Sequence, residues 1–128
     1  MTNQELVERF ETLTLNPELF SHREHVRLAW IYLRNYPTLT ALSKFCDGLK
    51  RFAASVGKPD LYHETITWAY LLLIRERMEK TVAWESWEDF AEKNGDLLDW
   101  QSNILKRYYR EETLQSDLAK RVFLFPDK

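Results

Sequence analysis

LYHETITWAYLLLIRERMEK, residues 61–80, is the stretch that decides the fold of this chain. Its run AYLLLI, residues 69–74, leaves no polar face for a turn and a half. Such a segment predicts a helix that is covered on all sides. The run is also too short to cross a bilayer. We therefore expect residues 61–80 to form a buried helix at the centre of the fold.

The rest of the chain predicts helices around this one. Gly and Pro number only three and four, and they fall where helices would begin or end. Ser21 and Glu24 form an S-x-x-E capping pattern, in which each side chain bonds the other residue's backbone amide. Gly57 and Gly95 fit C-terminal stops. The predicted fold is all-α, a single-domain irregular bundle of six or seven helices over residues 1–128, with helices near 2–13, 22–36, 38–56, 61–80, 86–94, 97–109 and 112–123.

Composition excludes several classes of protein. With 128 residues, 45% hydrophobic and 30% charged, the chain suits one globular domain. Its 18 basic and 20 acidic residues provide no basic field for nucleic acid or anionic lipid. The polar start MTNQELVERF lacks the apolar core of a signal peptide, so we expect a cytoplasmic protein. Cys46 is the only cysteine, which excludes an intramolecular disulfide and a cysteine-based zinc cluster.

Two charged segments have ordinary surface interpretations. RERMEK, residues 75–80, mixes charges at helical spacing and predicts surface ion pairs. KRYYR, residues 106–110, is basic and aromatic, but two glutamates follow it directly. A solvated helix end explains this segment better than a nucleic-acid site.

The three histidines fall in two short clusters, SHREH and YHET. His22 and His25 are predicted as the first and fourth residues of one helix, so both rings lie on one face. If Asp60 caps the central helix, His63 lies in its first turn. The partial positive charge of a helix N-terminus disfavours protonated imidazole, and neutral imidazole is the form that binds metal.

These positions favour a metal site with His22, His25 and His63 as ligands. Three imidazoles with an open coordination position suit a divalent ion such as Zn, Fe, Mn or Ni, and the open position can hold an activated water. No motif indicates a nucleotide or an organic cofactor. The leading hypothesis is therefore a metal-binding protein that acts on, or binds, a small molecule. Whether it is an enzyme stays open.

Supporting roles in such a site fall to three further side chains. The residues that would orient a ligand or move a proton are Tyr32, Glu64 and Thr67. Glu64 is adjacent to His63, but neighbouring helical residues point about 100 degrees apart. It need not reach the same ion.

Two alternatives compete with the metal site. Helix N-termini with Ser21, Thr65 and Thr67 nearby could hold a small anion, as in a non-enzymatic binding or regulatory module. The histidines could instead be purely structural. Separately, the tail FLFPDK, residues 123–128, is predicted to strap across the bundle or to meet a second subunit, and an interaction protein without a pocket would use it to form a homodimer.

The chain resembles a bacterial family of small all-helical proteins of unknown function. The resemblance rests on FSHREHVRLAWIYLRNYP, KPDLYHETITWAYLLLIRER and LAKRVFLFPD, which fit the patterns FxHxxHxxxAWxYL, YHxTxT and ARxxFxxPD. Lys120 stands where the pattern has Arg, and Arg110 follows the tyrosine pair where the family has Ser. The resemblance implies a helical fold and a role for the matched positions, without naming a reaction. Those positions are Phe20, His22, His25, Ala29, Trp30, Tyr62, His63, Thr65, Thr67, Ala119, Phe123, Pro126 and Asp127.

Overall fold

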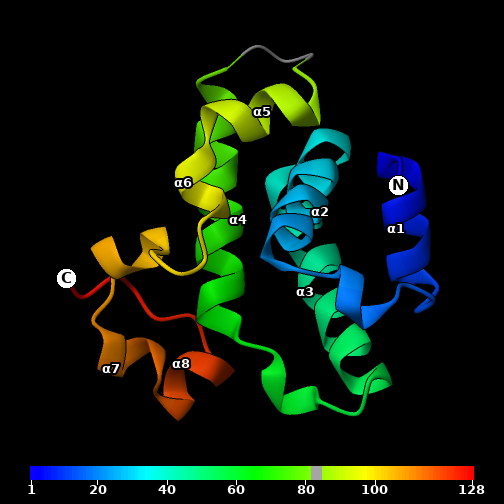
Figure 1. The fold of residues 1–128 in the computed structure, drawn as a ribbon. Helices are drawn as coiled ribbons and strands as arrows, with labels where there is room; N and C mark the ends of the chain where they lie inside the picture. Colours follow the sequence, from blue (N-terminus) through cyan, green and yellow to red (C-terminus); the bar gives the residue numbers. More distant parts are fainter. Residues whose placement is uncertain (82–84) are drawn as a thin grey trace. The chain divides into compact units, whose positions relative to one another are not determined.

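The computed structural model describes residues 1–81 and 85–128, and it confirms the all-α prediction (Figure 1). Within these residues there are α-helices and short 3-10 helices but no strand. The chain forms two compact units, Met1–Tyr62 and His63–Lys128. None of the helices in the described residues is both long and apolar enough to span a membrane.

Three main helices build the first unit, and α2 packs against both α1 and α3 (Figure 1). A cluster of aromatic rings lies among them, in which Phe10 of α1 contacts Phe20 and Phe52 at centroid distances of 5.6 and 6.0 Å. The elements of this unit are α1 (Asn3–Glu11), η1 (Pro17–Leu19), α2 (His22–Asn35), α3 (Thr38–Ser55) and η2 (Pro59–Leu61).

Local capping explains where the first helix begins and where the first and third helices end. Thr2 and Glu5 form a reciprocal capping box at the start of α1. Both helices end with paired backbone hydrogen bonds to the last turn, closed by a residue with positive φ. That residue is Gly57 after α3, as predicted, with φ +75°. After α1 it is Leu13, with φ +62°, a conformation that costs a residue with a side chain about 1 kcal/mol.

The start of α2 differs from the predicted capping box. Ser21 is the N-cap, as expected, but its side chain makes no capping bond to the backbone. Its hydroxyl donates instead to the carboxylate of Glu24. A hydrogen bond to an ionised oxygen is stronger than one between neutral groups, so the side chain turns toward the carboxylate. The helix still begins at His22, which places both histidines where the sequence predicted them.

The second unit is built along α4 (Figure 1). The buried residues of this helix include Thr65, Tyr70, Leu71 and Ile74. In Figure 1, α5 and α6 lie near its C-terminal end, whereas α7 and α8 lie near its N-terminal end. The elements of this unit are α4 (Glu64–Glu79), α5 (Trp87–Lys93), α6 (Gly95–Leu98), η3 (Ile104–Arg107), α7 (Glu111–Leu114) and α8 (Asp117–Arg121).

The predicted long helices over 97–109 and 112–123 are wrong, because short polar side chains interrupt them. Asp99 accepts a hydrogen bond from the amide of Ser102 at 3.1 Å. Asn103 and Ser116 then act as N-caps of η3 and α8. Such side chains compete with the helical hydrogen-bond ladder and begin new turns. Gly95 also begins α6 instead of closing α5, which ends at Asn94.

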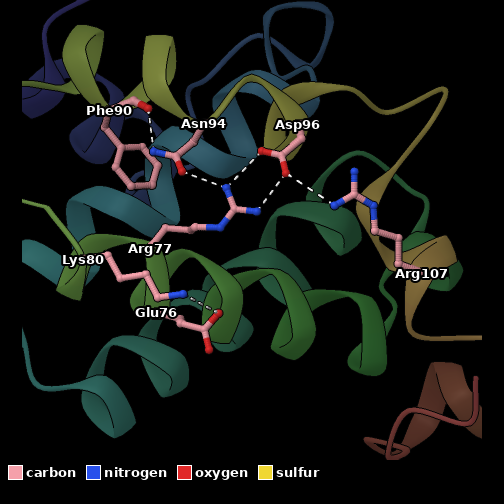
Figure 2. Close-up of polar contacts among 7 residues, drawn as sticks. All are labelled: Glu76, Arg77, Lys80, Phe90, Asn94, Asp96 and Arg107. Carbon is pink, nitrogen blue, oxygen red and sulfur yellow. Dashed lines mark hydrogen bonds and ion pairs between the residues drawn. The ribbon is translucent and has the colours of Figure 1, made fainter.

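One part of the predicted surface ion pairing is also wrong. Arg77 does not pair along its own helix but reaches Asp96 through two hydrogen bonds of 3.0 and 2.8 Å (Figure 2). It also donates to the side chain of Asn94 at 2.8 Å, and Asn94 donates to the carbonyl of Phe90 at 2.9 Å. This network ties α4 to the turn between α5 and α6. By contrast, Glu76 and Lys80 form the predicted surface pair, at 3.8 Å.

Candidate functional site

His22 and His25 occupy the first turn of α2, on one face of the helix. The amide of His25 donates to the carbonyl of Ser21 at 3.0 Å, which is the first hydrogen bond of the helix. The two rings are close enough for His22 to lower the pKa of His25 by charge repulsion. The structure therefore brings together two of the three predicted metal ligands.

His25 lies on the aromatic cluster of the first unit. Its ring stacks on Phe20 with a centroid distance of 3.9 Å and an interplanar angle of 12°. Phe20 in turn contacts Phe52 edge-on at 5.0 Å. Burial, and to a lesser degree His22, lowers the pKa of His25 to about 4. The imidazole is therefore neutral at pH 7, with one nitrogen carrying a free electron pair.

The ring nitrogens of His25 have no structural task in the described parts of the chain. Its backbone is bonded to Ser21 and its ring is stacked on Phe20, but no group there forms a hydrogen bond with Nδ1 or Nε2. Neither nitrogen is among the fully buried side-chain atoms of the described residues that lack a hydrogen-bond partner, and the residue is only half-buried. The ring is therefore a candidate ligand at the start of α2.

His63 has a different position from the one predicted. It is the N-cap of α4 rather than a residue of its first turn, and Nδ1 accepts a hydrogen bond from the amide of Ile66 at 3.1 Å. Nε2 lies 2.7 Å from the carbonyl oxygen of Leu114. Because Nδ1 accepts, Nε2 must carry the proton and donate. Both nitrogens are therefore in use, and a metal could bind only by displacing one of these bonds.

The three supporting candidates are placed as follows. The hydroxyl of Tyr32 donates to the Glu11 carboxylate at 2.7 Å, and burial together with this carboxylate raises the pKa of Tyr32. Thr67 donates to the carbonyl of His63 at 2.7 Å. Glu64 is the first residue of α4, where a carboxylate suits the helix dipole. Tyr32 belongs to the first unit, whereas Thr67 and Glu64 belong to the second.

Residues of the YHxTxT and PD patterns hold the C-terminal tail against α4. Thr65 is fully buried, and its hydroxyl donates to the carbonyl of Val122 at 2.8 Å while accepting from the amide of Leu124 at 3.1 Å. Phe123 stacks on Trp68 at 5.2 Å. The predicted strap is thus confirmed within the second unit, where the tail lies against α4.

Asp127 fastens the end of the same strap. Its carboxylate accepts from the amide of Arg110 at 3.0 Å and from the hydroxyl of Thr113. The hydroxyl of Tyr109 donates to the carbonyl of Leu124 at 2.7 Å. The sequence indicated Thr65 as a pattern position near a possible anion site and Asp127 only as a pattern position. Their role in holding the tail could not be predicted, because their partners lie far away in the chain.

The anion-binding alternative finds a carboxylate already at the start of α2. The hydroxyl of Ser21 is engaged by Glu24, and a second anion there would meet a like charge. At the start of α4, the ring of His63 and the hydroxyls of Thr65 and Thr67 are engaged as well. The geometry gives this alternative no specific support.

Two further findings bear on the site. Among residues 1–81 and 85–128, no group of three or more His, Cys, Asp or Glu side chains is arranged to hold a metal ion. His22 and His25 belong to the first unit and His63 to the second, so the three-ligand site stays a prediction. Comparison of the chain with models of protein families, with curated proteins and with solved structures gives no match.

Proposed function

We propose that this chain binds a divalent metal ion at the start of α2, with His25 and His22 as its protein ligands. The observation that carries the proposal is the ring of His25, which stacks on Phe20 while its nitrogens form no hydrogen bond within the described residues. A metal ion needs a neutral imidazole with a free electron pair. His25 offers that form at neutral pH.

Two imidazole ligands leave several coordination positions open. Water or a small molecule would fill them, and an imidazole-bound Zn, Fe, Mn or Ni ion can polarise such a ligand. This is the sense in which the protein would act on a small molecule. We assign His63 to the fold rather than to the metal, because both its nitrogens form hydrogen bonds. We further propose that the protein is cytoplasmic, that it binds a small molecule and that it forms a homodimer.

Metal analysis of the untagged protein tests the proposal. The protein is stripped with chelator, reconstituted separately with Zn(II), Fe(II), Mn(II) and Ni(II), and passed through a desalting column before elemental analysis. We expect stoichiometric metal for at least one ion. The variants His22→Asn and His25→Asn should each lose it, because one remaining imidazole binds weakly.

His63→Asn is the matched control, since it removes the third histidine without touching the proposed ligands. We expect this variant to retain the metal. Absence of stoichiometric metal after all four reconstitutions would refute the proposal, and so would full retention in His25→Asn. Loss of metal in His63→Asn as well as in the other two variants would instead support the three-histidine site.

A further inference from the structure

The ring of His63 makes two hydrogen bonds that impose opposite demands on its nitrogens. Nδ1 must accept from the amide of Ile66 at 3.1 Å, and Nε2 must donate to the carbonyl of Leu114 at 2.7 Å. Only the neutral ring with its proton on Nε2 can do both. The first bond caps α4, and the second holds the last residue of α7.

The segments near this ring depend on such contacts. α7 and α8 have only four and five residues, and helices that short do not persist in water by themselves. The tail that follows them is held by the hydroxyl of Thr65, two residues beyond His63. The end of the tail is bonded back to α7 through Asp127 and Thr113. The start of α4, α7, α8 and the tail therefore form one connected set of contacts.

Charge in this region also favours the neutral ring. Burial lowers the pKa of His63, the hydrogen bond to Leu114 opposes this effect, and the positive charge of Lys120 on α8 lowers the pKa further. Among the described charged groups, Lys120 is the one that acts on the ring. The other charged residues of the start of α4, α7, α8 and the tail are Glu64, Glu111, Glu112, Asp117, Arg121, Asp127 and Lys128.

We infer that His63 is an acid-sensitive latch that joins the start of α4 to α7, α8 and the tail. A proton added to Nδ1 turns the acceptor into a donor that faces the amide of Ile66, so the cap of α4 is lost. The bond from Nε2 to Leu114 alone cannot replace it. The start of α4 then frays, and the segments bonded to it loosen with it. This device is independent of the metal proposal, which uses other residues.

His63 becomes protonated at a lower pH than an ordinary histidine does, because its pKa is lowered in the folded protein. The neutral ring is fully present above the pKa of the unfolded state, and its contribution is lost as the pH falls through the folded pKa. Asp127 stays ionised in this range, because the hydroxyl of Thr113 and the amide of Arg110 lower the pKa of its carboxyl. The anchor at the end of the tail thus outlasts the latch.

Nuclear magnetic resonance on the ¹⁵N-labelled full chain tests this inference between pH 7 and pH 4.5. Long-range correlations of the imidazole nitrogens report the tautomer and the titration of His63. Amide exchange reports the protection of Ile66, and amide shifts report Val122 and Leu124. We expect the Nε2–H tautomer at pH 7. The protection factor of Ile66 should fall about fivefold or more as the ring titrates, the factor that corresponds to a lost N-cap.

His63→Asn is the decisive variant, because its side-chain oxygen can accept from the amide of Ile66 at any pH. We expect the response of Ile66 and the tail to be flat in this variant. A fall in protection as large as in the wild type would overturn the inference. So would a wild-type ring that titrates while the protection of Ile66 and the shifts of the tail stay constant.

Lys120→Met gives a second test that leaves the latch itself in place. Removal of this positive charge should move the titration of His63 to higher pH, and the response of the tail should move with it. A tail response that stays in place while the ring's titration moves would assign the opening to another group. This test holds even if His63→Asn does not fold.

Discussion

Gly48→Ala should destabilise the protein, although alanine is the better helix former. Gly48 lies inside α3, and a Cβ atom there would be 2.4 Å from Cε2 and 2.7 Å from Cζ of Phe10. The ring of Phe10 is 1% exposed and packs against Phe20 and Phe52, so it has little room to move away. Overpacking of this kind costs up to about 3 kcal/mol. The gain in helix propensity is about 1 kcal/mol, which leaves a net loss of about 2 kcal/mol.

Urea unfolding followed by circular dichroism measures this loss, and a double-mutant cycle assigns it to the ring. In a Phe10→Leu background the clash is relieved, so Gly48→Ala should there increase the free energy of unfolding by about 1 kcal/mol. The reasoning is refuted if Gly48→Ala stabilises the wild-type protein, or if its effect is the same in both backgrounds. Phe20 contacts Phe10 and stacks on His25, so a shift of the Phe10 ring in Gly48→Ala should also disturb the stacking of the candidate ligand His25.

Three further predictions concern stability. Folding lowers the pKa of His25 from 6.5 to about 4, so its contribution to the free energy of unfolding should fall by about 2 kcal/mol between pH 7 and pH 5. Urea titrations at the two pH values should show this fall in the wild type and not in His25→Gln. Leu13→Gly should raise the free energy of unfolding by about 1 kcal/mol, because φ there is +62°, and Gly57→Ala should lower it by a similar amount, because φ there is +75°. In thermal scans the melting temperature should rise in the first variant and fall in the second, and a change in the same direction in both would contradict this. Thr65→Val should lower the free energy of unfolding by about 3 kcal/mol, because it leaves two backbone groups of the tail without their hydrogen bonds. Thr67→Val should lower it by less than about 1 kcal/mol, since the carbonyl of His63 still accepts from a helical amide. Comparable losses in chemical denaturation would show that Thr65 does not hold the tail in this way.

The helix boundaries show which parts of the fold follow from local sequence. Ser86 and Gly57 mark ends that the structure confirms, because capping bonds involve residues only a few positions apart. Ser21 is also confirmed as an N-cap, although its side chain bonds Glu24 instead of the backbone. The same local chemistry misled the prediction after residue 97. There Asn103 and Ser116 begin new turns inside segments whose apolar spacing suits longer helices. Periodicity alone does not reveal which polar side chain will replace the backbone hydrogen bonds of a helix and end it.

The candidate site divides in the same way. The sequence by itself determined that the chain is helical and that His22 and His25 share the first turn of one helix, because helical periodicity and an N-cap suffice for both. Only the tertiary structure decided what each ring does. Phe20 and the cluster beneath it keep His25 half-buried and neutral, whereas His63 forms a hydrogen bond with Leu114, 51 residues away. Hydrogen bonds and burial depend on groups brought close by packing, and no spacing within a motif specifies them.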